Sequence, residues 1–198
     1  MKKYCLPPAA RAVMKGNDMN NRIVALVGMC GAGKSVVCEM FESAGWQKVY
    51  FGGVTMEELE KAGLEKNEKN EREVRERLRR EYGSAAFAIL LKPKIKQKLE
   101  KSNVVLDGLY SWSEYKCLKD EFGDTLEVLA VVTDRAIRYS RLAKRAVRPL
   151  TADEASSRDW AEIEKLEKGG PISIADHYVL NNGDIEVVRA EVEKIIGK

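Results

Sequence analysis

Short apolar runs alternate with longer amphipathic stretches along this chain. That alternation is typical of an α/β fold in which helices cover both faces of a parallel β-sheet. The apolar runs predict strands at residues 23–27, 48–51, 104–106, 126–132 and 177–180. The amphipathic stretches predict helices at residues 34–43, 55–62, 70–82, 84–99, 112–121, 135–146, 157–168 and 185–196. Pro93 removes an internal hydrogen bond, so we expect it to kink or divide the helix at 84–99.

Residues 28–35, GMCGAGKS, follow the first predicted strand and have the phosphate-binding form G-x-x-x-x-G-K-[ST]. Gly28 and Gly33 lack a side chain that would obstruct a backbone wrapped around phosphate oxygens, so loop N–H groups can converge on an anion. Lys34 is expected to reach the β- and γ-phosphates, and Ser35 to give Mg²⁺ a hydroxyl ligand. A chance glycine-rich turn is the weaker alternative. The residues expected to contact the nucleotide here are Gly28, Cys30, Gly31, Ala32, Gly33, Lys34, Ser35 and Val36.

Cys30 is an unusual residue for the middle of such a loop. Helix N-terminal dipoles and a nearby lysine both favour a thiolate, which would make the position sensitive to oxidants. A neutral filler role is the alternative, and both interpretations stay open.

The composition fits one domain. The chain has 198 residues, of which 44% are hydrophobic, enough for a single α/β core. Its 34 basic and 31 acidic residues are interspersed and give a net charge of +3, so no polybasic strip for nucleic acid stands out. The four cysteines form no C-x-x-C pair and there is one histidine, which argues against zinc and favours a reduced, cytoplasmic setting. No apolar run approaches the roughly 18 residues of a membrane span.

Three segments stand apart from the regular alternation. Residues 1–21 are expected to be a loosely attached extension, or sequence upstream of a start at Met19, with the domain at 22–198. Residues 52–101 form a long helical insert where small phosphotransferases of this architecture place the acceptor-binding arm. Residues 145–170 are rich in charged and small side chains and are placed to act as a lid.

Asp107 ends the third predicted strand and is followed by Gly108. Parallel sheets present ligands at the carboxyl ends of their strands, so Asp107 is expected to hold Mg²⁺ or to take a proton from an attacking hydroxyl. A turn-capping aspartate is the structural alternative, since Asp-Gly is a common turn signal.

Four arginines recur at three- or four-residue spacing in and after the predicted helix at 135–146. On a helix, Arg138, Arg141 and Arg145 share one face, and Arg148 follows its end. Arginines that close over a transferring phosphoryl group stabilise its charge, and Arg141 and Arg145 are the favoured pair. A basic surface stripe is the alternative. We interpret the nearby Arg158-Asp159 and Glu162 as exposed ion pairs that orient the lid.

The remaining candidates are single residues. Asn181, in the Asn-Asn-Gly that follows the last strand, either contacts a purine edge or only makes a turn. His177 is expected to be structural. Trp46, Trp112 and Trp160 lack interleaved basic residues, which argues against a nucleic-acid stacking platform, so we expect them to pack in the core.

Together, the loop at 28–35, the strand ending Asp107-Gly108, the arginine-rich helix and the segment at 175–183, ADHYVLNNG, resemble the dephospho-CoA kinase and nucleoside-monophosphate kinase group. The chain is most similar to an archaeal-type set of dephospho-CoA-kinase-like proteins over about residues 22–196. The resemblance implies a three-layer P-loop kinase fold with a five-stranded parallel sheet in the order 2-3-1-4-5. It also implies ATP·Mg²⁺ as the donor, nucleotide contacts from Arg148 and Asn181, and an arginine lid.

Two departures from that group concern the acceptor side. Where relatives carry an aspartate after the second strand and an arginine soon after it, this chain has Gly53 and Met56. Where an arginine often follows the Asp-Gly of the third strand, it has Tyr110. The substitutes considered are Arg72, Arg75, Arg79 and Lys92.

The leading hypothesis is an ATP-dependent kinase for dephospho-CoA or a nucleoside monophosphate, with Lys34, Asp107, Arg141 and Arg145 as catalytic residues and Ser35 and Asp107 as metal ligands. Its partners would be small molecules, not nucleic acid or membrane. The rival is a non-catalytic or slowly hydrolysing ATP-binding module with a protein partner. No Asn-Lys-x-Asp sequence is present to read guanine, and no paired Asp-Glu follows an apolar strand, which disfavours a GTPase and a mechanical ATPase. The sequence gives no indication of the oligomeric state.

Overall fold

The computed structural model describes residues 21–146 and 149–197. At its centre are the strands β1 (Ile23–Val27), β2 (Gln47–Tyr50), β3 (Val104–Asp107), β4 (Leu126–Val132) and β5 (His177–Leu180). They lie in the order β2-β3-β1-β4-β5, and each neighbouring pair is parallel. The predicted strands and sheet order are confirmed, with boundaries that move by at most one residue at β2 and β3. The extension expected at 1–21 lies outside the described residues, apart from Asn21.

The central strands β1, β3 and β4 are largely buried on both faces, as expected inside a parallel sheet, whereas the edge strands β2 and β5 are partly exposed. In β1, Ile23, Ala25 and Val27 belong to one apolar cluster, whereas Val24 and Leu26 belong to a second cluster on the opposite face. This division follows from the two-residue period of a strand. The sheet therefore forms the middle layer of three.

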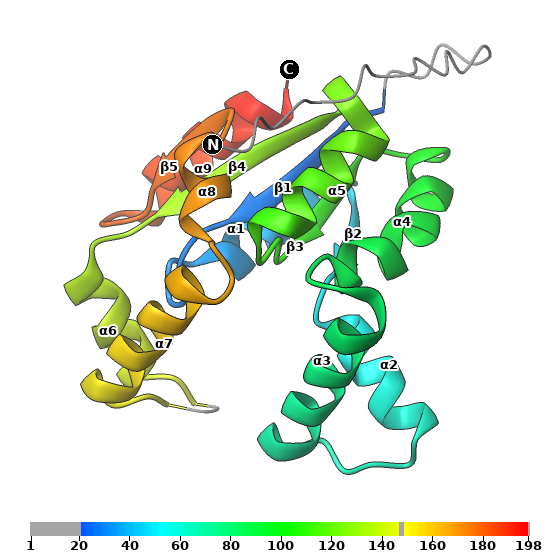
Figure 1. The fold of residues 1–198 in the computed structure, drawn as a ribbon. Coiled ribbons are helices and arrows are strands. Elements are labelled where there is room, and N and C mark those ends of the chain that lie inside the picture. Colours follow the sequence, from blue (N-terminus) through cyan, green and yellow to red (C-terminus); the bar gives the residue numbers. More distant parts are fainter. Residues whose placement is uncertain (1–20, 147–148, 198) are drawn as a thin grey trace, which may run out of the picture.

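Helices make the outer layers (Figure 1). The cluster on one face includes residues of α1 (Lys34–Ser43) and α9 (Ile185–Ile196). On the other face pack α4 (Ala86–Leu99), α5 (Trp112–Phe122) and the short α8 (Gly169–Ser173). In the part of the chain that the structure describes, no helix has the length and apolar character needed to cross a membrane.

Two helical lobes project from the sheet on the side where its strands end (Figure 1). One contains α2 (Gly53–Lys61) and α3 (Glu68–Tyr82), and the other contains α6 (Arg135–Ala143) and α7 (Ala152–Glu164). The chain thus places its two long insertions at the edge where ligands of α/β sheets bind.

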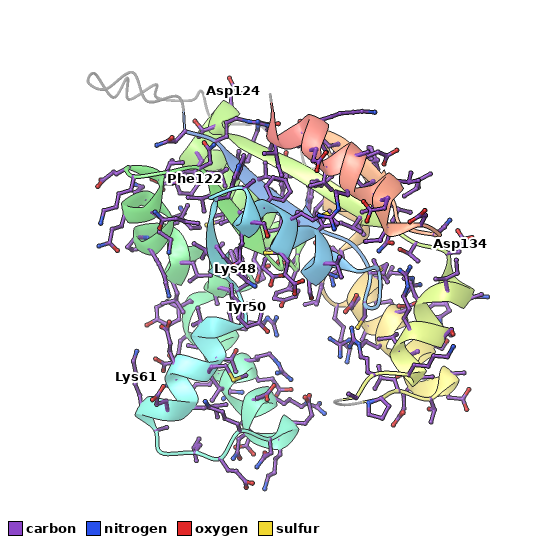
Figure 2. All side chains as sticks on the ribbon, turned by 180° about the vertical axis from the view of Figure 1, so that it is seen from behind. Lys48, Tyr50, Lys61, Phe122, Asp124 and Asp134 are labelled. Carbon is purple, nitrogen blue, oxygen red and sulfur yellow. The ribbon has the colours of Figure 1, made fainter. Side chains whose placement is uncertain are left out.

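The labelled side chains mark this arrangement (Figure 2). Lys48 and Tyr50 lie where β2 leads into the α2–α3 lobe, and Asp134 lies at the start of α6. Phe122 and Asp124, by contrast, lie at the opposite edge of the sheet, where α5 passes through a 3₁₀ turn (Gly123–Thr125) into β4.

The boundaries of α6 and α7 differ from the predicted ones, and the short α8 was not predicted. The α6 helix ends at Ala143, and α7 begins at Ala152, five residues before the predicted start. A capping box explains that start: the Thr151 hydroxyl accepts a hydrogen bond from the Glu154 N–H (3.3 Å), and the Glu154 carboxylate accepts one from the Thr151 N–H (2.8 Å). Periodicity alone did not reveal this cap, nor the short α8.

Pro93 does not divide its helix, because α4 runs from Ala86 to Leu99 with the proline inside it. Buried Leu91 and Ile95 flank the proline and pack into the core. Burial of two large apolar side chains contributes roughly 3–6 kcal/mol, comparable to the cost of an interior proline, about 3 kcal/mol. The helix therefore remains continuous.

Candidate functional site

The phosphate loop joins β1 to α1 and is shaped by glycines with positive φ. Gly28 has φ 142°, and a Cβ there would lie 2.3 Å from the backbone oxygen of Val131 in β4. At Gly33, with φ 93°, a Cβ would lie 2.2 Å from the side-chain nitrogen of Asn181. The loop is thus held against β4 and the end of β5, a position that only glycine allows. This cradle fits the phosphates of a nucleotide.

Lys34 lies at the first position of α1 and folds back over the loop. Its ammonium donates to the carbonyl oxygens of Gly28 (2.7 Å) and Met29 (3.1 Å). Burial, together with the charge of nearby Lys168, lowers the pKa of Lys34 to about 8. Its neighbours Ser35 and Val36 are exposed, so the Ser35 hydroxyl is accessible to a metal ion that arrives with phosphates.

Asn181 holds the phosphate loop in place. Its amide donates to the Ala32 carbonyl (2.9 Å), which also accepts the Thr133 hydroxyl (3.0 Å). The neighbouring Asn182 accepts from the Asp134 N–H (2.9 Å) and so fixes the start of α6. The segment is therefore more than a simple turn, because the Asn181 amide holds the loop. A contact from Asn181 to a purine edge stays a prediction.

Arg138 has a different role from the one expected. It is buried, its guanidinium forms a two-pronged ion pair with Asp159 (2.9 and 2.7 Å), and Nη1 also donates to the Cys30 carbonyl (3.0 Å). Asp159 and Glu162 are buried too, which corrects the expectation of exposed pairs on α7. Arg138 therefore connects α6, α7 and the phosphate loop, and its guanidinium is not available to a ligand.

We expect Arg138→Ala to lower the free energy of unfolding by about 3 kcal/mol or more, because it leaves Asp159 buried without its charged partner. Urea unfolding followed by circular dichroism measures the change. Arg135, exposed on the same helix, gives the matched control: Arg135→Ala should change stability by less than about 0.5 kcal/mol. Equal stabilities for the two variants would contradict this role for Arg138.

Two of the proposed lid arginines do lie near the loop. Arg141 donates through Nη2 to the Asn181 carbonyl (3.0 Å), while its buried Nη1 finds no hydrogen-bond partner among the described residues. Arg145 lies with Nη1 3.9 Å from the Cys30 sulfur. An uncompensated buried N–H is costly unless a further acceptor binds there, so Arg141 fits a site for an anion.

Arg148 lies outside the described residues. Cys30 is buried, and its redox sensitivity stays a prediction.

Asp107 ends β3, beside the phosphate loop that follows the neighbouring strand β1. Its Oδ2 lies 3.5 Å from the ammonium of Lys48, which also pairs with Glu42 (3.2 Å). The carboxylate is 14% exposed and therefore still reachable. Carboxylate and hydroxyl oxygens suit Mg²⁺, so Asp107 and Ser35 fit the role of metal ligands.

The sequence analysis missed Lys168 and underestimated Glu162. Lys168 is 1% exposed, and its ammonium lies 2.8 Å from Oε2 of Glu162. The same oxygen accepts the Cys30 N–H (3.3 Å). Burial opposes ionisation of Glu162, but Lys168, Lys34 and Arg158 together hold its pKa below the ordinary value. No sequence pattern distinguishes Lys168 from the other lysines of its charged segment.

The considered substitutes for the missing acceptor-side arginines differ in their surroundings. Arg72 pairs with Glu76, Arg75 with Glu68 and Glu71, and Lys92 with Glu121. Arg79 instead lies over the Phe87 ring, 5.2 Å from its centroid, and burial lowers its pKa. Arg79 is therefore the strongest of these candidates for an acceptor anion.

Other single-residue predictions have mixed outcomes. His177 is structural as expected, since its Nε2 lies 2.7 Å from Glu127, which also pairs with Arg22. Trp46 is buried against Phe41. The packing prediction is wrong for Trp160, which is 64% exposed on α7.

The parallel sheet in this order, with a glycine-rich phosphate loop between β1 and α1, defines the class of P-loop domains with a kinase-like fold. Residues 24–165 match the family model described as an AAA domain. The chain belongs to the UPF0200 family within this class. It is 37% identical to the UPF0200 protein of Thermococcus gammatolerans over 180 residues, 89% of this chain and 94% of the relative. The UPF0200 protein of Thermococcus kodakarensis is 36% identical over 178 residues, 88% and 96% of the two chains.

Solved structures share the fold at low sequence identity. TT1252 from Thermus thermophilus superposes with a TM-score of 0.65 at 17% identity, covering 89% of this chain and 97% of that one. Shikimate kinase from Bacteroides thetaiotaomicron gives 0.56 at 16% identity (88% and 96%). Dephospho-CoA kinase from Campylobacter jejuni gives 0.52 at 16% identity (90% and 97%).

Proposed function

We propose that this protein is a cytoplasmic ATP-dependent small-molecule kinase that transfers the γ-phosphoryl group to dephospho-CoA or a nucleoside monophosphate. The observation that carries the proposal is the cradle itself, in which the Gly28–Gly33 backbone, the Lys34 ammonium and Nη1 of Arg141 surround one region. This Nη1 has no hydrogen-bond partner within residues 21–146 and 149–197. Such a concentration of donors favours a polyphosphate. The kinase structures with the same fold support the class of reaction.

Each residue has a chemical role in this proposal. ATP with Mg²⁺ supplies an activated phosphoryl group whose charge is partly neutralised by the metal. Lys34 and the loop N–H groups would bind and orient the phosphates, and Ser35 with Asp107 would hold the metal. With dephospho-CoA as the acceptor, Asp107 accepts the proton of the attacking hydroxyl, whereas the ionised phosphate oxygen of a nucleoside monophosphate attacks without a base. Arg141 and Arg145 stabilise negative charge that develops on the transferred group. The segment at 145–170 excludes water as a lid, and the arm at 52–101 binds the acceptor.

A second candidate is a nucleotide-binding module that hydrolyses ATP slowly or not at all and signals to a protein partner. Met56 and Tyr110 stand where the kinase group carries acceptor-side arginines, which favours this alternative. The exposed Trp160 and Ile163, 64% and 53% exposed on α7, also fit a surface that contacts another protein.

A phosphotransfer screen separates the two candidates. The purified protein is incubated with ATP and Mg²⁺ and either dephospho-CoA or each member of a nucleoside-monophosphate panel, and ADP release is measured with and without acceptor. The kinase proposal expects one acceptor to stimulate ADP release at least about tenfold and to become phosphorylated. ATP binding without stimulation by any acceptor would favour the binding module.

A further inference from the structure

Lys168 lies where the phosphate loop meets the loop that follows β3. It precedes α8, is 1% exposed, and its ammonium lies 5.4 Å from the centroid of the Tyr110 ring. Tyr110 comes three residues after Asp107, the expected proton acceptor. A lysine this deeply buried is unusual unless a partner offsets the loss of hydration. Its position is therefore between the donor loop and the acceptor side of the proposed site.

Glu162 provides that partner, and its carboxylate also accepts hydrogen bonds from the phosphate loop and from Arg158. One oxygen, Oε2, accepts both the Lys168 ammonium (2.8 Å) and the Cys30 N–H of the phosphate loop (3.3 Å). The other oxygen, Oε1, accepts Arg158 Nε (3.3 Å). The Glu162 carboxylate thus accepts hydrogen bonds from a loop N–H and from two cationic side chains. The same donors would bind a phosphate oxygen.

The local charge also favours a further anion. Lys34, Lys168 and Arg158 are all coupled electrostatically to Glu162, so three cations surround one carboxylate. The nearby charge of Lys168 adds to burial in lowering the pKa of Lys34. The ammonium groups of Lys34 and Lys168 repel one another, and a site of low dielectric constant screens this repulsion poorly. A phosphate that enters between them would relieve this repulsion.

We propose that Lys168 binds the terminal phosphate of a nucleoside triphosphate, and that it exchanges Glu162 for that phosphate when the nucleotide binds. The terminal phosphate is the expected one because Lys168 lies between the Cys30 region of the loop and Tyr110 on the acceptor side. Lys168 is thereby a catalytic residue that distinguishes triphosphate from diphosphate. This inference rests on the proposed nucleotide site.

The test compares the affinities of a non-hydrolysable ATP analogue and of ADP, each with Mg²⁺, by isothermal titration calorimetry. Lys168→Met keeps the apolar stem and removes the charge, so it should weaken binding of the ATP analogue by about tenfold or more and change ADP binding by less than about twofold. Glu162→Gln removes the competing charge and should tighten binding of the analogue by about threefold. Lys165, exposed on the same segment, gives the control Lys165→Met, which should change neither affinity.

Lys168→Met leaves the buried Glu162 carboxylate without its partner and could therefore misfold. The double variant Lys168→Met/Glu162→Gln avoids this unpaired charge, and like Lys168→Met it should no longer bind the ATP analogue in preference to ADP. If Lys168→Met and the double variant weaken the binding of the ATP analogue and of ADP equally, or weaken neither, Lys168 is a structural residue. If Glu162→Gln binds the ATP analogue as tightly as the unaltered protein or more weakly, the proposed exchange of Glu162 for the terminal phosphate is wrong. Failure of the unaltered protein to bind either nucleotide would instead overturn the proposed function.

Discussion

Replacing Lys34 with alanine is expected to abolish measurable ATP turnover and leave the fold intact. Among the residues that the structure describes, the Lys34 ammonium donates hydrogen bonds only to the carbonyls of Gly28 and Met29, both in the loop, so the core does not depend on it. In the proposed reaction it stabilises charge on the β- and γ-phosphates, and loss of such a group costs about 10²–10³-fold in kcat or more. ADP release with the acceptor found by the screen measures the effect.

Two measurements make the Lys34→Ala result interpretable. Far-UV circular dichroism and thermal unfolding should match those of the unaltered protein, since the Lys34 ammonium bonds to carbonyls of the loop and not to the core. Lys194→Ala, an exposed lysine on α9, should keep full turnover. Near-normal turnover in a folded Lys34→Ala protein would remove the phosphate loop from the mechanism.

The second large effect is expected at Asp107. Asp107→Asn keeps the size of the side chain and removes its charge and basicity, so phosphotransfer should fall by about 10²-fold or more with little change in ATP affinity. This pattern is expected of a group that acts mainly in the transition state. Steady-state kinetics and nucleotide titration together measure the two quantities.

Asp120, exposed on α5, provides the control for Asp107. Asp120→Asn should leave both ATP affinity and phosphotransfer within about twofold of the unaltered protein. Parallel losses of ATP affinity and turnover in Asp107→Asn would point to a metal-binding role in the ground state. Full activity in Asp107→Asn would leave the aspartate as a turn residue that pairs with Lys48.

The core elements could be predicted from the sequence because their signals are local. The runs at Ile23–Val27, Leu126–Val132 and His177–Leu180 begin and end where the structure places β1, β4 and β5. The apolar character of β1 and β4 follows from burial on both faces of a parallel sheet, whereas in the edge strand β5 Val179 is buried and Tyr178 and Leu180 are exposed. The phosphate loop was equally clear, since closely spaced glycines and a lysine form the binding geometry within one short segment.

The α6–α7 region could not be predicted as well. The periodicity of α6 extends past Ala143 in the sequence, but the chain leaves the helix there and restarts at the Thr151 cap. Helix ends are set by capping hydrogen bonds and by packing against other elements, and periodicity carries little information on either.

The sequence by itself determined the strands of the sheet and the identity of the phosphate loop, and its motifs gave the class of the protein and the order of the sheet through their resemblance to a known family. Only the tertiary structure decided what the charged side chains around that loop do. Arg138 pairs with Asp159, 21 positions away, and Glu162 contacts Cys30, 132 positions away. Lys168 owes its burial to the same packing of α7 against the loop. A charge becomes a ligand-binding group or a structural one according to its burial and its partners, and both depend on contacts between segments far apart in the chain.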